Sequence, residues 1–228
     1  LRQWVGSYGY AKTHAKAGGR AGAFSYFASA FRAQLGGWRQ FSGFDNTGFH
    51  SKLGYQFGNG ATLTSILSYD RLLQRIPGSL TAAEVAADPR QANPAIAPTG
   101  GTRGNIDEFR AAATLRAPVG GSGQLELTGY YVPRPIYSTI SGPIRNTQFF
   151  INRGATARFL SSAPVLGLAN RFTVGVDYQN TPLSNSIFSR TTGAAQQQLQ
   201  EDLGSVGLYV QNELTLRRGL LVNAGGRF

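Results

Sequence analysis

The chain has 228 residues, with 30 Gly, 14 Phe and 10 Tyr but no Cys or Met. This composition favours aromatic strands joined by glycine turns. No apolar run reaches the roughly 18 residues of a membrane helix, and the lack of Cys excludes disulfides, thiol catalysis and Cys-based metal sites. Lys and Arg (22) outnumber Asp and Glu (11). These basic residues are scattered, mostly singly, without the basic stripe of a nucleic-acid module, so nucleic acid is not expected as a partner.

Alternation of apolar and polar residues predicts ten strands along the chain. In chain order they cover Gln3–Thr13, Gly22–Arg32, Thr47–Phe57, Ala61–Arg71, Ile106–Ala117, Gln124–Val132, Thr147–Leu160, Asn170–Asn180, Val206–Leu216 and Leu220–Phe228. One short helix is expected between the fourth and fifth strands, where Thr81 and Glu84 form a capping box.

The connections between these strands alternate in length. Short turns are predicted at 14–21, 58–60, 118–123, 161–169 and 217–219, and long loops at 33–46, 72–105, 133–146 and 181–202. Outer-membrane barrels have short periplasmic turns, long extracellular loops and strands of about 9 to 11 residues. We therefore expect an all-β fold, an antiparallel up-and-down transmembrane β-barrel segment. A soluble sandwich is disfavoured because its loops would not sort by parity.

The last hairpin shows the alternation most clearly. From Val206 to Leu216 every even position except Asn212 is apolar, and the pattern resumes after the turn at Arg217, Arg218 and Gly219. A three-residue loop ending in Gly pairs Leu216 with Leu220 and Leu214 with Val222. The same register places Tyr209 opposite Arg227 and Glu213 opposite Asn223 on the polar face.

Aromatic residues should mark the two membrane interfaces. Six fall at the loop ends of the predicted strands and two at the turn ends: Phe49, Tyr69, Phe109, Tyr131, Phe149 and Tyr178, and then Phe57 and Phe172. In this arrangement both termini lie on the long-loop side, whereas single-chain barrels begin and end in the periplasm. We therefore expect residues 1–228 to be part of a barrel of twelve or more strands. The alternative is a complete ten-stranded barrel closed at Phe228.

Three stretches resemble the barrel of TonB-dependent outer-membrane receptors, particularly the siderophore-receptor branch. VGSYGYAKTHAKAGG with GGWRQFSGFDN resembles the early barrel, IPGSLTAAEVAADPRQANP resembles an early extracellular loop, and LYVQNELTLRRGLLVNAGGRF resembles a mid-barrel hairpin. The resemblance implies a barrel of about 22 strands with an N-terminal plug, which imports ferric siderophores or cobalamin with energy from the TonB complex. Residues 1–228 would be a partial barrel domain. The plug and the TonB-binding segment are absent from this sequence.

Little in the sequence points to catalysis or to a bound metal. His14 and His50 are the only histidines, one expected in a turn and one on a strand's polar face, so no metal site and no cofactor are expected. No Gly-x-Ser-x-Gly elbow precedes a helix, which disfavours a hydrolase. We expect a non-enzymatic receptor and transporter for a ferric siderophore or a similar chelate. A passive porin and an outer-membrane hydrolase are the alternatives.

Binding is expected at the loops. Aromatic faces and guanidinium groups suit a bulky anionic chelate, and the candidates are Trp38, Arg39, Phe41, Phe44, Arg71, Arg75 and Arg103. The competing interpretation assigns Trp38 to the interface belt and the arginines to lipopolysaccharide or to solvent. On the polar face, charges of both signs should hydrogen-bond to a plug or to water: Lys52, Arg110, Arg116, Arg158 and Arg227 with Asp70, Glu126, Asp177 and Glu213. The expected partners are the chelate, the TonB complex through the missing plug, and outer-membrane lipid and lipopolysaccharide.

Overall fold

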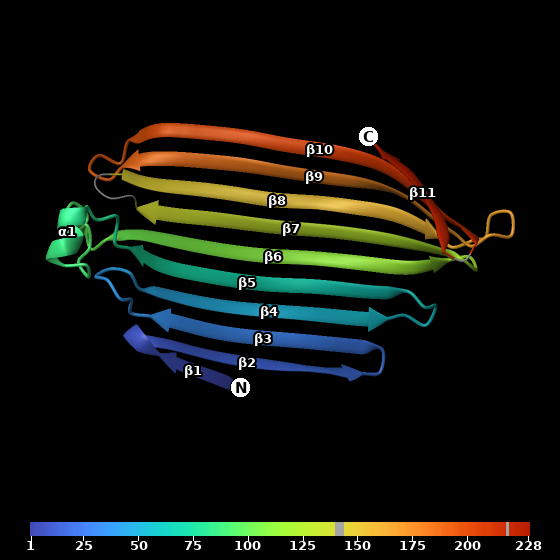
Figure 1. Ribbon diagram of the computed structural model, residues 1–228, viewed down its shortest axis with the longest axis horizontal. Helices are drawn as coiled ribbons and strands as arrows, with labels where there is room; N and C mark the ends of the chain where they lie inside the picture. The colour runs from blue at the N-terminus through green and yellow to red at the C-terminus, as the bar shows by residue number, and fades with distance from the viewer. Residues whose placement is uncertain (140–143, 218) are drawn as a thin grey trace.

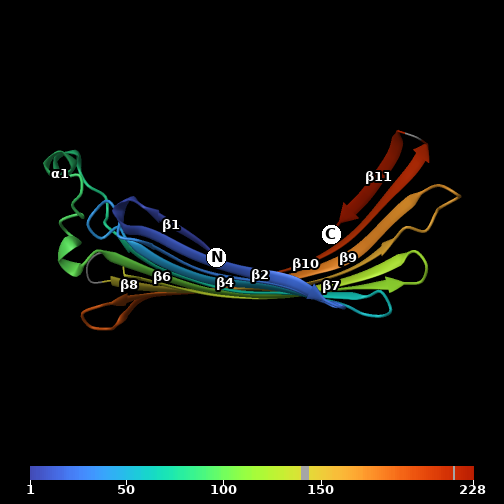
Figure 2. The same cartoon turned by 90° about the horizontal axis from the view of Figure 1, so that it is seen from below.

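A computed structural model describes residues 1–139, 144–217 and 219–228. Eleven strands form one antiparallel sheet in which the spatial order equals the chain order, so that each strand is paired with its neighbours in sequence (Figure 1). Strands β1 and β11 are its two edges. Figure 2 shows that the sheet is strongly curved, as expected for a segment of a barrel wall. The all-β, up-and-down prediction is confirmed.

The strands vary widely in length, and three short helices join some of them. The strands are β1 (Arg2–Gly6), β2 (Tyr10–Ala21), β3 (Phe24–Leu35), β4 (Phe44–Gln56), β5 (Thr62–Ile76), β6 (Thr102–Val119), β7 (Gly123–Thr139), β8 (Ile144–Ser161), β9 (Asn170–Ser189), β10 (Ala195–Arg217) and β11 (Leu220–Arg227). The helices are η1 (Ser7–Gly9), α1 (Ala82–Ala87) and η2 (Ala97–Thr99). No helix in the described part of the chain has the length and apolarity needed to cross a membrane.

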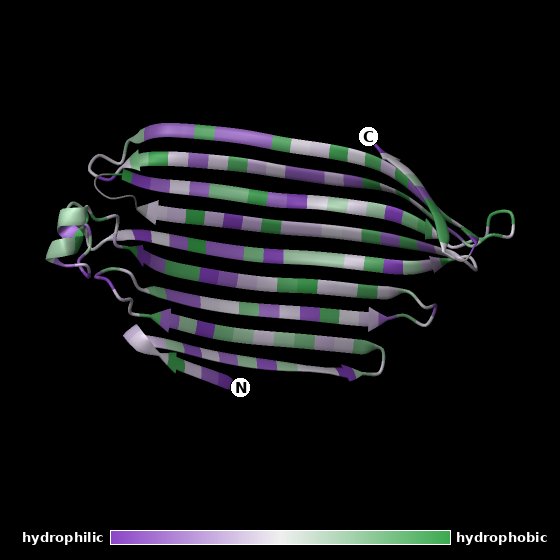
Figure 3. Cartoon of the chain, viewed as in Figure 1, coloured by the Kyte–Doolittle hydropathy of each residue, from purple (hydrophilic) through white to green (hydrophobic). Residues whose placement is uncertain are grey.

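Alternation along each strand gives the sheet an apolar face and a polar face (Figure 3). In β4, Phe49 and Leu53 lie on the apolar face, and His50 lies on the polar one. The register keeps the faces aligned between strands, because Phe49 is opposite Tyr69 and Tyr69 is opposite Phe109. Phe49 is 47% exposed, so the apolar face has no covering layer within the described structure.

A single curved sheet has almost no core of its own. Among the described residues the buried apolar side chains are Ala33, Ala61, Ala92 and Ile96, and the buried polar ones are Ser68, Glu126 and Asn180. Ala92 and Ile96 lie in the connection between β5 and β6 rather than in the sheet. The strands are therefore held by backbone ladders and cross-strand side-chain pairs, and the apolar face requires lipid or another apolar layer.

The first hairpin differs from the prediction, and the number of strands changes with it. The expected strand Gln3–Thr13 is broken at η1, where Tyr8 has a φ of 58°, and the chain reverses there to form β1 and β2. The expected turn at 14–21 is strand, since β2 continues to Ala21. The described residues consequently form eleven strands. Because β1 runs toward the end of the sheet that carries the long loops, residue 1 does not lie at that end, in contrast to the prediction.

All four predicted long loops are shorter than expected because their strands continue, and 33–46 is reduced to 36–43. Most of 133–146 belongs to β7 and β8, most of 181–202 belongs to β9 and β10, and β5 and β6 extend into 72–105. Nine of the eleven strands have 12 to 23 residues, so the expected 9 to 11 is wrong. Polar and proline-bearing segments were assigned to loops because their composition suggested turns, but antiparallel pairing accommodates them.

The predicted pairing of the last hairpin is mostly confirmed. Leu214 lies opposite Val222, Tyr209 opposite Arg227 and Glu213 opposite Asn223. The pairing of Leu216 with Leu220 is wrong, because an irregularity between Thr215 and Arg217 places Arg217 opposite Leu220. Arg218 of the predicted turn lies outside the described residues.

The two ends of the sheet differ, as the sequence predicts, although less regularly. The turn end holds the connections 22–23, 57–61, 120–122, 162–169 and the one before β11, whereas the loop end holds η1, 36–43, 77–101 and 190–194. Among the described connections at the loop end, only 36–43 and 77–101 are long, and 162–169 at the turn end is as long as 36–43. The loop end is further extended by the long hairpins β7–β8 and β9–β10.

Candidate functional site

The two long connections at the loop end, 36–43 and 77–101, are tied together by Arg39. Its guanidinium donates from Nη1 to the Gly78 carbonyl (2.9 Å) and from Nη2 and Nε to the Gln91 carbonyl (2.9 and 3.1 Å). The Gln40 amide donates to the Arg90 carbonyl at 2.7 Å. A guanidinium can satisfy several carbonyls at once. The two connections therefore form one unit, which we call the cap (36–43 and 77–101).

Two glycines allow the cap to close tightly. Gly78 and Gly101 have φ of 74° and 83°, a region that glycine enters without strain. A Cβ on Gly78 would lie 2.5 Å from the Ile96 side chain, and one on Gly101 would lie 2.7 Å from the Phe41 side chain. The predicted short helix is present as α1, with the capping box complete: the Thr81 amide donates to the Glu84 carboxylate at 2.7 Å, and the Glu84 amide donates to the Thr81 hydroxyl at 3.3 Å.

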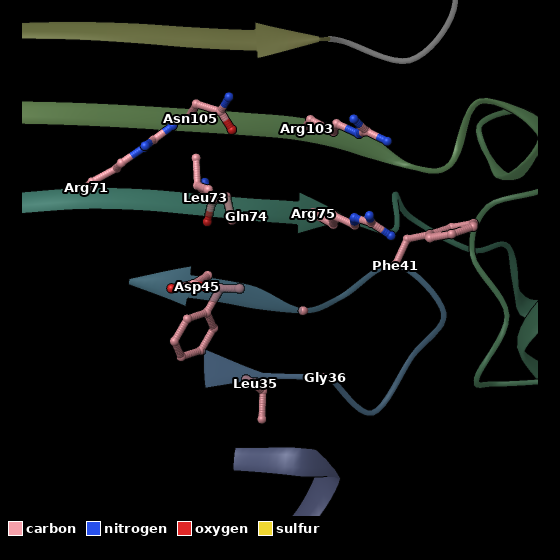
Figure 4. Close-up of a pocket in the computed structure, with 12 residues that line it drawn as sticks. Leu35, Gly36, Phe41, Asp45, Arg71, Leu73, Gln74, Arg75, Arg103 and Asn105 are labelled. Atoms are coloured by element: carbon pink, nitrogen blue, oxygen red, sulfur yellow. The ribbon is translucent and has the colours of Figure 1, made fainter. Parts of the chain in front are cut away.

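A hollow of about 530 Å³ lies beneath the cap, at the loop end of β3 to β6. Figure 4 shows its labelled side chains, with Arg71 and Arg75 on β5, Arg103 and Asn105 on β6, and Phe41 reaching over from the cap. The Arg75 guanidinium lies 5.9 Å from the Phe41 ring centre, within cation–π distance. Three arginines thus converge on one open hollow.

The structure brings five of the seven predicted binding residues together and separates two. Those lining the hollow are Phe41, Phe44, Arg71, Arg75 and Arg103. Arg39 lies outside the hollow and donates its hydrogen bonds within the cap. Trp38 is outside the hollow, 44% exposed, with the Arg90 guanidinium 6.0 Å from its ring centre.

The arginines of the hollow lie on the apolar-face side of the sheet, beyond the aromatic residues. Tyr69, Arg71 and Arg75 are separated by two and then four residues along β5, and therefore share a face. Arg71 Nε is 3.6 Å from Asp107, which also accepts a hydrogen bond from the Tyr69 hydroxyl at 2.6 Å. Because β5 continues beyond Tyr69, the hollow lies beyond the aromatic and apolar part of this face.

The carboxylate of Asp45, at the edge of the hollow, is paired with side chains of β3. The Arg32 guanidinium binds both of its oxygens, at 2.6 and 3.2 Å, and the Gln34 amide donates to it at 3.0 Å. The hydrogen bond from Arg32 lowers the pKa of Asp45 despite some desolvation. The positive charge of Arg71 also lowers the pKa of Asp45, whereas no ion pair joins Asp45 to Arg75 or Arg103 within the described structure.

Sequence reasoning did not identify Asp45 and Asn105 as part of this hollow. The pairing of the strands brings them to the hollow, because Leu73 on β5 is opposite Asp45 on β4 and Asn105 on β6. The alternation of Arg71, Leu73 and Arg75 was a signal that the two arginines share a face, but the partner positions depend on pairing between strands.

The charged residues that the sequence places on the polar face form ion pairs with one another. Glu126 lies between Arg116 and Arg158, with the Arg158 contact at 2.6 Å, and Asp177 is 3.2 Å from Arg227. Glu108 similarly lies between Arg110 and Arg134, and Arg171 is 3.7 Å from Glu213.

The two histidines lie on this same polar face. His50 pairs with Asp70 at 3.2 Å. His14 is in β2, not in a turn, and its ring is near those of Trp4 and Phe31. Within the described ranges, no group of three or more His, Asp or Glu side chains could hold a metal ion.

Comparison with solved structures identifies proteins of the same fold. The ferric citrate transporter FecA, in its unliganded form, aligns with a TM-score of 0.82 over 97% of this chain at 16% identity. The ferripyoverdine receptor of the outer membrane of Pseudomonas aeruginosa, bound to ferripyoverdine, aligns at 0.80 with 10% identity, and the siderophore receptor PirA from the same organism at 0.65 with 13%. Each alignment covers 97% of this chain. No protein-family model and no curated protein matches the chain.

The chain spans about a third of the length of these proteins, between 34 and 35%. At such low identity the likeness establishes the fold alone. The resemblance to the receptor barrel stated from the sequence is confirmed at that level. The chain therefore has the fold of part of the barrel of siderophore receptors.

Proposed function

We propose that this chain is part of the barrel of an outer-membrane receptor that takes up a ferric siderophore or a similar chelate. The observation that carries the proposal is the likeness over 97% of the chain to one transporter and two receptors of iron chelates. These three proteins are a transporter and two receptors, which supports the non-enzymatic prediction. Energy would come from the TonB complex, through a plug formed by sequence outside these 228 residues.

The orientation follows from the two ends of the sheet. The turn end faces the periplasm and the loop end faces the outside, in accord with the rule for outer-membrane barrels. The apolar face contacts lipid and the polar face lines the lumen. Phe49, Tyr69 and Phe109 then lie near the outer interface, where aromatic rings are favoured.

Within this scheme, chelate contacts are assigned to the cap and the adjacent polar face. Trp38 offers an exposed ring next to the Arg90 guanidinium, a combination that suits a bulky anionic chelate. Phe44 begins β4 at a polar-face position opposite Leu35 and Gln74. Arg39 positions the cap. Arg71, Arg75 and Arg103 lie on the other side of the sheet, away from a ligand moving through the lumen.

Uptake of ⁵⁵Fe chelates by cells tests the proposal. The full-length receptor, expressed in an iron-starved strain without its own receptors, should import one member of a panel that includes ferric citrate and ferripyoverdine. Import should stop when the TonB gene is deleted. Uptake that continues without TonB would favour a passive porin. A protein that takes up no chelate but cleaves ester substrates would favour the hydrolase.

The ligand contacts are tested by comparing the two tryptophans of this chain. Trp38→Ala should weaken binding of the transported chelate by about tenfold, as expected for the loss of a desolvated cation–π and stacking contact. Trp4→Ala is the matched control, because Trp4 is 40% exposed but lies on the polar face of β1, against Lys12 and far from the cap in the sequence. Equal affinity of the two variants would remove Trp38 from the site.

A further inference from the structure

The apolar face carries a second concave space, of about 390 Å³, across β6 to β9. Ala113, Gly129 and Ala155 form its floor, since they lie directly opposite one another on β6, β7 and β8. The next residues toward the turn end, Leu115 and Leu127, are larger and form a wall. The nearest heavy atom to a Cβ on Gly129 would be 4.0 Å away. We call this space the recess, and it opens on the side away from the polar face.

Tyr178 on β9 protrudes beside the recess. It lies directly opposite Ala155 on β8 and Val206 on β10, so the three side chains share the apolar face. Tyr178 is 46% exposed, and its hydroxyl has no hydrogen-bond partner within the described structure. A tyrosine hydroxyl removed from water usually finds such a partner. The same face thus offers a recess and, next to it, a ring large enough to enter one.

A cation and an anion lie on the loop-end side of the recess. Arg153 on β8 is opposite Tyr131 and Asn180, and its Nε donates to the Asn180 side-chain oxygen at 3.0 Å. The buried Asn180 amide donates in turn to the carboxylate of Asp202 on β10. None of the ion pairs among the described residues includes Arg153 or Asp202. Both charges are therefore available to a partner that carries the opposite charges.

These features make the surface complementary to itself. In a two-fold symmetric contact the same patch is used by both molecules, so each must supply both halves of every interaction. A two-fold axis between β8 and β9 would place Tyr178 of each copy over the recess of the other. It would also bring the Arg153 side of one copy toward the Asp202 side of the other. Small residues allow backbones to approach closely in membrane interfaces.

The chemistry of the patch distinguishes a second copy from the hydrocarbon around it. An acyl chain can fill the recess, but it offers no group to the Tyr178 hydroxyl or to the remaining donors of Arg153. A second copy supplies a ring for the recess and a carboxylate for the guanidinium, through the same residues. Charge complementarity therefore selects the occupant, and the apolar contacts add to it.

We propose that the apolar face of β6 to β10 binds a second copy of this chain, so that two receptors lie side by side in the outer membrane. This inference rests on the membrane location given under the proposed function, but it does not require that a chelate be transported. The cap and the polar face remain free in both copies.

Cross-linking in outer membranes tests the contact directly. Ala155→Cys, in a full-length receptor without other reactive cysteines, is treated with a short bismaleimide and should give a species of twice the receptor mass. The matched control is Ala30→Cys, which is on the apolar face of β3 opposite Phe49 and should stay monomeric. Equal cross-linking of the two would indicate random collision and overturn the proposal. A cross-link to a protein of another mass would overturn it in favour of a different partner.

Filling the recess tests its part in the contact. Ala155→Phe should weaken dimerisation of the purified receptor by about tenfold, because it blocks the centre of the interface. Ala30→Phe places the same side chain elsewhere on the apolar face and should leave dimerisation unchanged. Native mass spectrometry over a range of receptor concentrations measures both. Unchanged dimerisation of Ala155→Phe would remove the recess from the interface, and a monomeric parent receptor would mean that acyl chains fill it.

Charge reversal tests the ionic part of the contact. Arg153→Glu should weaken dimerisation by about tenfold, because it would set like charges of the two copies against each other. Adding Asp202→Arg to the same chain should restore it, since both charges are then exchanged. Failure of the double variant to recover, while its heat-modifiable migration on gels shows a folded barrel, would contradict the assigned pairing.

Chelate uptake by the same strains separates this proposal from the proposed function. Ala155→Phe should import the chelate as the parent does, because the recess faces away from the lumen. If no chelate is imported while Ala155→Cys is cross-linked as expected, the contact stands and the transport proposal fails. If the chelate is imported but no receptor pair is found, transport stands and this inference is wrong.

Discussion

At the scale of single residues, Arg39 decides whether the cap is a fixed structure. It makes three hydrogen bonds to the backbone of 77–101, and replacement by Ala would leave two carbonyls without their partners. We expect Arg39→Ala to speed proteolytic cleavage within 77–101 of the folded receptor by about tenfold, because local opening would cost roughly 1.5 kcal/mol less. Limited trypsin digestion at native pH measures it. Trypsin can cleave 77–101 only after Arg90, so combining Arg90→Ala with Arg39→Ala should abolish this cleavage, and cleavage that persists would show that the opened segment lies elsewhere.

Glu126 is the residue whose charge matters most for the polar face. It is 8% exposed and lies between Arg116 and Arg158, so Glu126→Gln would leave two guanidinium groups facing each other without a carboxylate. Removing a buried carboxylate that neutralises two partly exposed guanidinium groups is costly, and we expect a loss of about 1–2 kcal/mol in the free energy of unfolding. Glu213→Gln, 3.7 Å from Arg171, should cost under about 0.5 kcal/mol. Urea titration of the receptor in detergent micelles compares the two, and equal losses would contradict this account.

At the scale of elements, aromatic residues cover glycines on the neighbouring strand. Phe31 lies opposite Gly48, Tyr130 opposite Gly154, and Tyr209 opposite Gly175. In each case a Cβ on the glycine would lie within 2.6 Å of the aromatic side chain. This arrangement protects the exposed glycine backbone and fixes the register between the two strands.

Two glycines on adjacent strands test that arrangement. A Cβ at Gly154 would lie 2.5 Å from the Tyr178 carbonyl and 2.6 Å from the Tyr130 hydroxyl, whereas at Gly129 the nearest atom is 4.0 Å away. Gly154→Ala should therefore destabilise the barrel by roughly 1–3 kcal/mol. Gly129→Ala should be neutral or slightly stabilising, because it restricts the unfolded chain. Unfolding in urea measures both, and the reverse order would show that the Tyr130 contact does not set the local packing.

The positions where sequence and structure disagree are mainly element boundaries. Alternation located the centres of most strands, because one face must be apolar and the period of two is local information. It did not locate their ends: Pro133, Pro135 and the Gln-rich segment 196–200 are in strands because pairing with β8 and β9 stabilises them. The hollow was partly predictable, since Arg71 and Arg75 occupy alternate positions of one strand and must share a face. Asp45 and Asn105 were not, because their place depends on the register of three strands.

At the scale of the whole molecule, the described part is one sheet with two different faces and two different ends. An isolated sheet of this kind would leave the outer edges of β1 and β11 without partner strands and would expose one apolar face. This combination promotes association between sheets. The charges fit the same division, since acidic residues on the polar face lie next to arginines. In the proposed orientation, lipid on one face and an aqueous lumen on the other would account for both the apolar face and the charged one.

This arrangement predicts which residues are reachable from outside the cell. The chain has no cysteine, so single cysteines can be introduced at Ser79 in the cap and at Gly121 in a turn-end connection, in a full-length receptor without other reactive cysteines. A membrane-impermeant maleimide should label Ser79→Cys on intact cells, because the cap lies at the loop end. It should label Gly121→Cys only after the outer membrane is permeabilised, because that turn faces the periplasm. Labelling of Gly121→Cys on intact cells with Ser79→Cys protected would mean that the sheet is inserted the other way, with the cap at the periplasmic side.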